Sequence, residues 1–166
     1  MKDTYIRKSI KDLLMEVIMR ALIQRVSRAD VQIGGKVAGE IGKGYVVLLG
    51  VGSEDDADSC AKLWSKIRRL RIFPDENGKT NLDISQVNGE CLIVSQFTLF
   101  ADLRRGNRPG FSYSAPPELG NSLYELFVEM AKKDIENVQT GEFGAEMQVT
   151  LTNDGPFTIW LDTEEF

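Results

Sequence analysis

Gly44–Val51 (GYVVLLGV) and Cys91–Ala101 (CLIVSQFTLFA) are two apolar runs of the length of a β-strand. The first is uninterrupted by any charged or amide side chain, which is typical of a central strand buried on both faces. The second is equally apolar at its start but carries Ser95, Gln96 and Thr98 further along. We expect these two strands to form the centre of a sheet, and the rest of the chain to be built around them.

Five further segments have strand-like patterns, and they lie on either side of this centre. They are Ala21–Val26, Ala29–Ile33, Lys36–Ile41, Glu146–Thr152 and Phe157–Asp162. The link Gly34-Gly35 predicts a hairpin between Val31–Ile33 and Lys36–Ile41, because both glycines tolerate a positive φ. A polar excursion, Phe73–Ser85, contains a second turn at Asn77-Gly78.

Two segments have the period of an amphipathic helix. The first opens at Ser53-Glu54-Asp55-Asp56, where a serine cap and acidic residues in the first turn favour a helix start. Its apolar face is Cys60, Leu63, Trp64, Ile67 and Leu70, and its basic face is Lys62, Lys66 and Arg69. The second helix, Glu118–Lys133, follows Pro116-Pro117.

The chain is 166 residues long, with 42% hydrophobic and 27% charged residues. That length suits one domain with its own core, and no linker or repeat divides it. Residues 19–166 are therefore expected to form a single α/β domain. Residues 1–18 form an N-terminal extension with the pattern of an amphipathic helix. We consider a docked helix, a targeting segment and an upstream start codon before Met19, and we favour the last.

Histidine is absent from the sequence. This excludes Ser-His-Asp and Cys-His hydrolases and histidine-ligated zinc or haem. We expect no metal and no cofactor. The net charge of −5 argues against a protein that binds nucleic acid by bulk electrostatics, although a local basic stripe stays possible. Cys60 and Cys91 each lie in an apolar run, so we interpret them as buried reduced thiols.

Three segments are candidates for chemistry. Burying an unpaired hydroxyl or amide costs about 1–3 kcal/mol, so the polar residues of Ser95–Thr98 either bond to the backbone without a function or line a site, and we favour the site. Asn153–Thr158 (NDGPFT) is either a plain turn or a rigid element that presents two backbone carbonyl groups to a ligand. The loop with Arg104, Arg105 and Arg108 is either solvated or in contact with phosphate. The basic face of the first helix is likewise either solvated or in contact with phosphate.

Together these segments resemble one known family. Met19–Arg28 (MRALIQRVSR), the SQFTLFA run, the GNRP loop and the NDGPFT turn are similar to the motifs of D-aminoacyl-tRNA deacylase, also called D-tyrosyl-tRNA deacylase. The resemblance runs in order from Met19 to Phe166. Two positions depart from the family pattern: Phe157 stands where valine is usual, and Gly110 stands where serine is usual.

The resemblance implies a fold of three layers, with a helical layer on two β-sheet layers of mixed and antiparallel strands. It also implies a homodimer with active sites at the dimer interface, and the two reduced thiols favour a cytoplasmic location. The cis Gly155-Pro156 turn of one subunit, with Asn153 beside it, would enter the active site of the other and bind the α-amino group of the substrate. Arg25 matches the family arginine that helps to hold this turn. An L side chain would be excluded, and glycine would be accepted.

The implied reaction is hydrolysis of the ester bond of D-aminoacyl-tRNA, a proofreading or editing reaction. It suits a chain without histidine, because the ester is already activated and the enzyme need only stabilise an oxyanion. The candidate catalytic residues are Ser95, Gln96, Phe97 and Thr98, with the N–H groups of Phe97 and Thr98 as oxyanion donors. The free 2′-OH of the terminal adenosine would assist water. Thr98 as a covalent nucleophile is the alternative, but no adjacent base is visible.

Two other functions compete with this hypothesis. A non-catalytic RNA-binding or ribosome-associated module would use the basic helix face and the basic loop, and would need no site at Ser95–Thr98. A hydrolase of small esters or amides would act without tRNA. The expected partner is aminoacylated tRNA, with these six residues as candidate tRNA contacts: Lys62, Lys66, Arg69, Arg104, Arg105 and Arg108. No DNA and no membrane partner is expected.

Overall fold

The structure, a computed structural model, describes residues 18–166. The expectations about the N-terminal extension therefore lie outside the described residues, apart from Ile18. The described strands are β1 (Arg20–Ile33), β2 (Lys36–Ile41), β3 (Gly44–Gly50), β4 (Phe73–Pro74), β5 (Thr80–Leu82), β6 (Glu90–Ser95), β7 (Val138–Thr140) and β8 (Gln148–Asp162). The helices are α2 (Ala57–Ile67) and α3 (Pro117–Asp134), with short 3-10 turns at Phe97–Phe100 and Thr163–Glu165.

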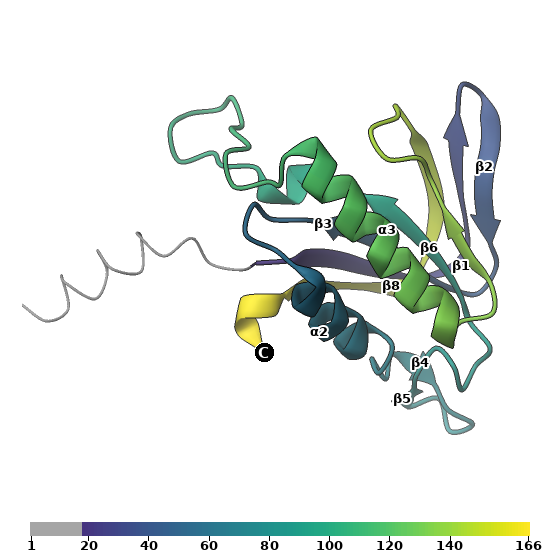
Figure 1. Cartoon of the computed structure of the whole chain (residues 1–166). Coiled ribbons are helices and arrows are strands. Elements are labelled where there is room, and N and C mark those ends of the chain that lie inside the picture. Colours follow the sequence, from purple (N-terminus) through teal and green to yellow (C-terminus); the bar gives the residue numbers. More distant parts are fainter. Residues whose placement is uncertain (1–17) are drawn as a thin grey trace, which may run out of the picture.

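One mixed sheet organises the molecule (Figure 1). Its order is β2-β1-β3-β6-β7, and β8 pairs with β1. The pairs β3–β6 and β6–β7 are parallel, while β1 pairs antiparallel with β2, β3 and β8. A separate small sheet joins β4 to β5 around Gly78, which has a φ of +73°. Both predicted tight turns are confirmed, since Gly34 and Gly35 also have positive φ, at +57° and +78°.

The sheet is folded over so that it supplies two of three layers. The first half of β1 pairs with β3, whereas its second half pairs with β2. Register shifts between Gln24 and Arg28 mark the bend, and β8 follows β1 on both sides of it. The sequence predicted two short strands at each of these places. The structure has one long bent strand in each case, because the partner strand continues the hydrogen bonding across the bend.

Two hydrophobic cores separate the three layers. One face of β3, with Tyr45, Val47 and Leu49, packs in the larger core together with the buried faces of α2 and α3. The opposite face presents Val46 to the second core. The other members of that core include these residues of the folded-over half and of β6: Val26, Ala29, Val31, Ile41, Leu92 and Val94. The predictions of a central strand buried on both faces and of a three-layer α/β domain are confirmed.

The start of α2 differs from the prediction. Asp56, not Ser53, is the N-cap: its carboxylate accepts the Ser59 N–H at 2.9 Å, and the Ser59 hydroxyl accepts the Asp56 N–H at 3.2 Å. This reciprocal pair is a capping box. Ser53 lies before the helix, where its N–H donates to the Tyr113 carbonyl at 3.0 Å. The acidic run was a correct signal for a helix start, but the helix begins at Ala57, after the last acid of the run, Asp56, which caps it.

Candidate active site

The motif at the end of β6 forms a turn rather than a strand. β6 ends at Ser95, and the Gln96 N–H makes a last bond to the Leu49 carbonyl at 2.7 Å. A 3-10 turn then runs over Phe97–Phe100. The expected strand over Cys91–Ala101 is therefore wrong beyond Ser95. The polar side chains are not buried in a strand interior, because the chain turns out of the sheet where they begin.

This turn presents unused donors. Its first internal bond runs from the Leu99 N–H to the Gln96 carbonyl at 3.2 Å. The N–H groups of Phe97 and Thr98 precede that bond, so they remain for an acceptor outside the turn. The Gln96 amide Nε2 contacts the Thr98 hydroxyl oxygen, and the Thr98 side chain is exposed. Donors of this kind can stabilise a developing oxyanion.

A cavity of about 560 Å³ opens beside the turn. Three segments line it: the end of β6 with the start of the turn, the segment before α3, and the segment that leads into β8. The lining residues are Val94, Ser95, Gln96, Phe97, Ser114, Ala115, Pro117, Phe143, Gly144, Ala145, Met147 and Val149. Three of the four predicted catalytic residues therefore line one cavity, and Thr98 follows them in the turn.

Sequence reasoning missed the far wall of this cavity. Phe143, Met147 and Val149 come from the entry to β8, more than forty residues after the turn. The alternation of Met147 and Val149 with polar neighbours indicated a strand, but no local pattern indicated a cavity. Phe111 is a further unpredicted neighbour, because its ring lies 4.8 Å from that of Phe97 in an edge-to-face contact.

The second predicted segment is an exposed turn within β8. The side chain of Asn153 bridges the two ends of the turn with two hydrogen bonds. Its Oδ1 accepts the Phe157 N–H at 2.8 Å, and its Nδ2 donates to the Thr158 hydroxyl at 2.7 Å. The Gly155-Pro156 peptide bond is cis, and both residues are exposed. Gly155 has a φ of +138°, and a Cβ there would lie 2.9 Å from the Phe157 nitrogen. The position therefore has room only for glycine.

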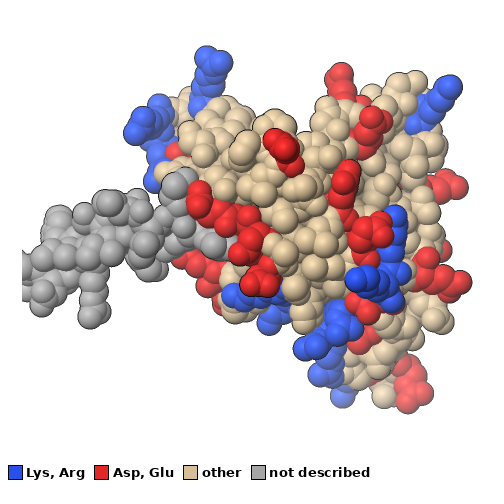
Figure 2. All heavy atoms as spheres, in the orientation of Figure 1, with Lys and Arg blue, Asp and Glu red and all other residues tan. Residues whose placement is uncertain are grey.

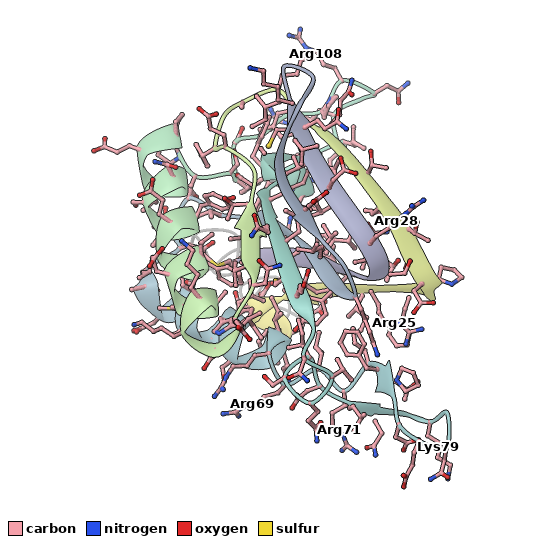
Figure 3. All side chains as sticks on the ribbon, turned by 90° about the vertical axis from the view of Figure 1, so that its right-hand side faces the viewer. Arg25, Arg28, Arg69, Arg71, Lys79 and Arg108 are labelled. Atoms are coloured by element: carbon pink, nitrogen blue, oxygen red, sulfur yellow. The ribbon has the colours of Figure 1, made fainter. Side chains whose placement is uncertain are left out.

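Arg25 holds this turn to the body of the protein. Its Nε donates to the Asp154 carbonyl at 3.0 Å, and its Nη1 donates to the Ile72 carbonyl at 2.6 Å. The guanidinium carbon also lies 4.8 Å from the centroid of the Phe157 ring. One side chain thus joins β1, the turn and the segment after α2, and Figure 3 shows it at the end of the molecule where Arg69 and Arg71 lie.

Within one chain, the cavity and the turn are far apart. Ser95 of β6 and Ala21 of β1 pair with the same residue of β3, on its two sides. Asn153 of β8, in contrast, pairs with Val26 of β1. These positions are about 16 Å apart along β1, at about 3.3 Å per residue, and the spacings between β6, β3, β1 and β8 add to that. The structure therefore brings Ser95, Gln96 and Phe97 to one cavity, with Thr98 next in the turn, and Asn153–Pro156 to another place.

The two cysteines are buried and free, as the sequence predicted. Desolvation, with a smaller contribution from nearby Asp55 and Asp56, raises the pKa of Cys60 to about 12. Burial raises the pKa of Cys91 even further. Neither thiol ionises near neutral pH, so neither is a nucleophile. In the described part of the chain, no cluster of three or more Cys, Asp or Glu side chains could hold a metal ion.

The six predicted tRNA contacts do not form one surface. Lys62 donates to the Thr163 carbonyl at 2.7 Å, and the ammonium groups of Lys62 and Lys66 lie 5.4 and 4.8 Å from the Phe166 ring. The arginine loop lies at the opposite end of the molecule from Arg69, as Figure 3 shows for Arg108. The basic residues are thus divided between two regions.

No helix in residues 18–166 is long and apolar enough to span a membrane.

The sequence model described as D-Tyr-tRNA(Tyr) deacylase matches residues 22–162. A D-aminoacyl-tRNA deacylase of Thermosipho africanus is 54% identical over 147 residues, covering 89% of this chain and 99% of the relative. One of Haemophilus influenzae is 55% identical over 144 residues, covering 87% and 99%.

Two solved structures have a similar fold. A structure titled "c-Myc DNA Unwinding Element Binding Protein" has a TM-score of 0.82 and 41% identity, covering 86% of this chain and 97% of that one. A second, titled as a probable eukaryotic D-amino acid tRNA deacylase, has a TM-score of 0.77 at 16% identity, covering 87% and 99%, and shares the fold. The chain therefore belongs to the D-Tyr-tRNA(Tyr) deacylase family, a family of hydrolases.

Proposed function

We propose that this protein hydrolyses the ester bond of D-aminoacyl-tRNA and releases a free D-amino acid and tRNA. The observation that carries the proposal is the match to relatives named D-aminoacyl-tRNA deacylase over nearly their whole length. The geometry supports it, because a cavity of about 560 Å³, large enough for an aminoacyl group, lies beside two N–H donors that no bond of the 3-10 turn uses. When these N–H groups stabilise the oxyanion, hydrolysis of the bound ester requires no histidine.

The reaction proceeds by attack of water on the ester carbonyl carbon. The N–H groups of Phe97 and Thr98 bind the resulting oxyanion, with Gln96 at their side. The carbon–oxygen bond to the ribose then breaks, the ribose oxygen takes one proton of the attacking water, the other proton passes to solvent, and the amino acid leaves as a carboxylate. The neighbouring 2′-OH of the terminal adenosine orients the water, which also restricts the substrate to RNA. Thr98 acts as a hydrogen-bonding group, because its exposed hydroxyl lies against the Gln96 amide and not against a base.

We assign the selection of D-aminoacyl groups to the Gly155-Pro156 turn of a second subunit. The carbonyl groups at Gly155-Pro156 bind the α-amino group and leave no space for an L side chain, whereas glycine is accepted. The separation of turn and cavity within one chain supports a homodimer, since only a second copy can bring this turn to the cavity. Rejection by steric clash and unpaired polar groups discriminates more strongly than favourable contacts do.

The test is deacylation of D-tyrosyl-, L-tyrosyl- and glycyl-tRNA by the full chain in the presence of a chelator. We expect release from the D-tyrosyl and glycyl substrates and none from the L-tyrosyl substrate. Gly155→Ala should lower release by about 100-fold or more, as loss of a positioning group does. Gly78→Ala is the matched control, because it also has a positive φ but has no atom within 4 Å of its added Cβ.

Each contrary result has a clear meaning. Equal release from D- and L-tyrosyl-tRNA would leave a hydrolase but refute selection by the turn. Cleavage of free D-tyrosyl esters as fast as the tRNA substrate would point to a small-ester hydrolase. Binding of tRNA without release from any substrate would refute catalysis and favour an RNA-binding module.

A further inference from the structure

A protruding loop lies at the rim of the cavity. It runs over residues 102–113, which we name the rim loop (Figure 1). Two hydrogen bonds between Asp102 and Gly110, of 2.8 and 2.9 Å, close its base. The loop follows the 3-10 turn directly, and Ser114 and Ala115 at its end line the cavity. If the end of a polymer is bound in the cavity, the rest of the polymer can therefore run outward along this loop.

The rim loop is basic in an acidic protein. It contains Arg104, Arg105 and Arg108 against a single acid, Asp102, whereas the whole chain has a net charge of −5. Two charge-assisted bonds, of 2.9 and 2.8 Å, hold Arg104 on Asp102, and they lower the pKa of Asp102 to about 2. Arg105 and Arg108 are exposed at the tip, and Figure 2 shows blue atoms gathered on this projection. Such a surface attracts phosphate groups.

The loop also presents an ordered aromatic ring. Tyr113 is 52% exposed, and its hydroxyl accepts a 2.7 Å hydrogen bond from Arg104 Nη2. The backbone carbonyl of Tyr113 is fixed by the Ser53 N–H. The ring is therefore exposed but held in place, which reduces the entropy lost when another ring stacks on it. Unpaired bases stack on exposed aromatic side chains in this way.

We propose that the rim loop binds the unpaired nucleotides that precede the terminal adenosine of the substrate tRNA, with Tyr113 stacking on a base and Arg105 and Arg108 contacting phosphates. This inference rests on the proposed function, because it takes the aminoacyl end to lie in the cavity. Arg104 acts by orienting Tyr113. The exposed Tyr113 ring among the arginines favours RNA over a second copy of this chain as the occupant, because RNA offers both a base that stacks on the ring and phosphates that bind the arginines.

The test compares D-tyrosyl-tRNA with D-tyrosyl-adenosine, which keeps the terminal nucleotide but lacks the rest of the tRNA, including these unpaired nucleotides. We expect Tyr113→Ala and the double variant Arg105→Ala/Arg108→Ala each to raise KM for the tRNA about tenfold. Both variants should leave kcat/KM for D-tyrosyl-adenosine unchanged. Tyr113→Phe, which keeps the ring, should retain tRNA activity. Lys36→Ala/Lys79→Ala removes two exposed positive charges that lie outside the rim loop and outside the candidate tRNA contacts, so it is the charge-matched control and should have no effect.

A second measurement does not depend on catalysis. Fluorescence anisotropy with a labelled single-stranded RNA ending in CCA should show that the double arginine variant binds more weakly and with a salt dependence reduced by a slope of about 2. Equal losses on both substrates, an effect of the control pair, or a change in the mass of the assembly in Tyr113→Ala would overturn this inference alone. A wild-type chain that cleaves neither substrate would overturn the proposed function and this inference with it.

Discussion

Asp55 is a carboxylic acid that the fold buries beside the start of α2. Its side chain is 4% exposed, and Oδ2 accepts the Gly52 N–H at 2.6 Å. Oδ1 has no hydrogen-bond partner in the described part of the chain. Desolvation raises the pKa of Asp55 to about 6, against the opposing effect of the Gly52 bond. The folded state thus favours the neutral form of this group.

This residue predicts a pH dependence of stability. The pKa of Asp55 in the folded state lies above its unfolded value of about 3.9. The protonated Asp55 therefore contributes its full share to the free energy of unfolding below pH ~4, and this contribution is lost as the pH rises through about 6. Asp55→Asn, which cannot ionise, should therefore gain stability relative to the wild type between pH 4 and 7, by about 3 kcal/mol. Urea unfolding at a series of pH values measures this. The exposed Asp58→Asn controls for the lost charge, and parallel curves for wild type and Asp55→Asn would contradict the prediction.

Among the elements, the parallel pair β3–β6 leaves no room for a side chain at the first residue of β3. Gly44 pairs with Glu90, and a Cβ on Gly44 would lie 1.8 Å from the Glu90 carbonyl oxygen and 2.6 Å from its nitrogen. Both neighbours are backbone atoms of a central strand, so they cannot move aside as a side chain would. The same pair of strands supplies Ser95 and Gln96 at its far end, so it positions the candidate site.

Gly44→Ala should therefore destabilise the protein severely. Overpacking of a core costs about 1–3 kcal/mol, and we expect at least the upper end here because the clash is with backbone. Gly42→Ala is the matched control, since the nearest atom to its Cβ is a Glu90 side-chain oxygen at 3.8 Å, an ordinary contact. Its free energy of unfolding should stay within about 0.5 kcal/mol of the wild type. Similar urea midpoints for the two variants would show that the strands adjust to the added carbon.

At the scale of the whole molecule, the long bent strands β1 and β8 extend the fold from the cavity to the turn. The Ser95 end of the sheet carries the cavity, and the bend carries the turn that Arg25 holds. One chain therefore carries both halves of the proposed site, at separate places in the fold. In a symmetric dimer, each site would combine the cavity of one subunit with the turn of its partner.

Mixing two inactive variants tests this arrangement. Gln96→Ala alters the cavity and Gly155→Ala alters the turn, so each homodimer should be inactive. After reassortment, half of the dimers are mixed, and each mixed dimer has one site with an intact cavity and an intact turn. About a quarter of the wild-type activity should therefore return. If each site belonged to a single subunit, the mixture would stay as inactive as its components.

Several features follow from the sequence because they depend on neighbours along the chain. The Gly34-Gly35 hairpin, both helices and the buried central strand over Gly44–Val51 were predicted correctly, since periodicity and turn chemistry are local properties. The Ser95–Thr98 and Asn153–Thr158 motifs were recognised as candidate site segments, and the burial of both cysteines was foreseen from their apolar surroundings.

Other features were decided only by the tertiary structure, because they depend on partners distant in sequence. β1 and β8 continue through their bends because each hydrogen-bonds to the other, and the run after Ser95 leaves the sheet where its pairing with Leu49 ends. The far wall of the cavity comes from the entry to β8, and Phe166 contacts two of the lysines predicted to bind RNA. The sequence determined which segments carry polar chemistry; strand register and long-range packing determined which of them meet.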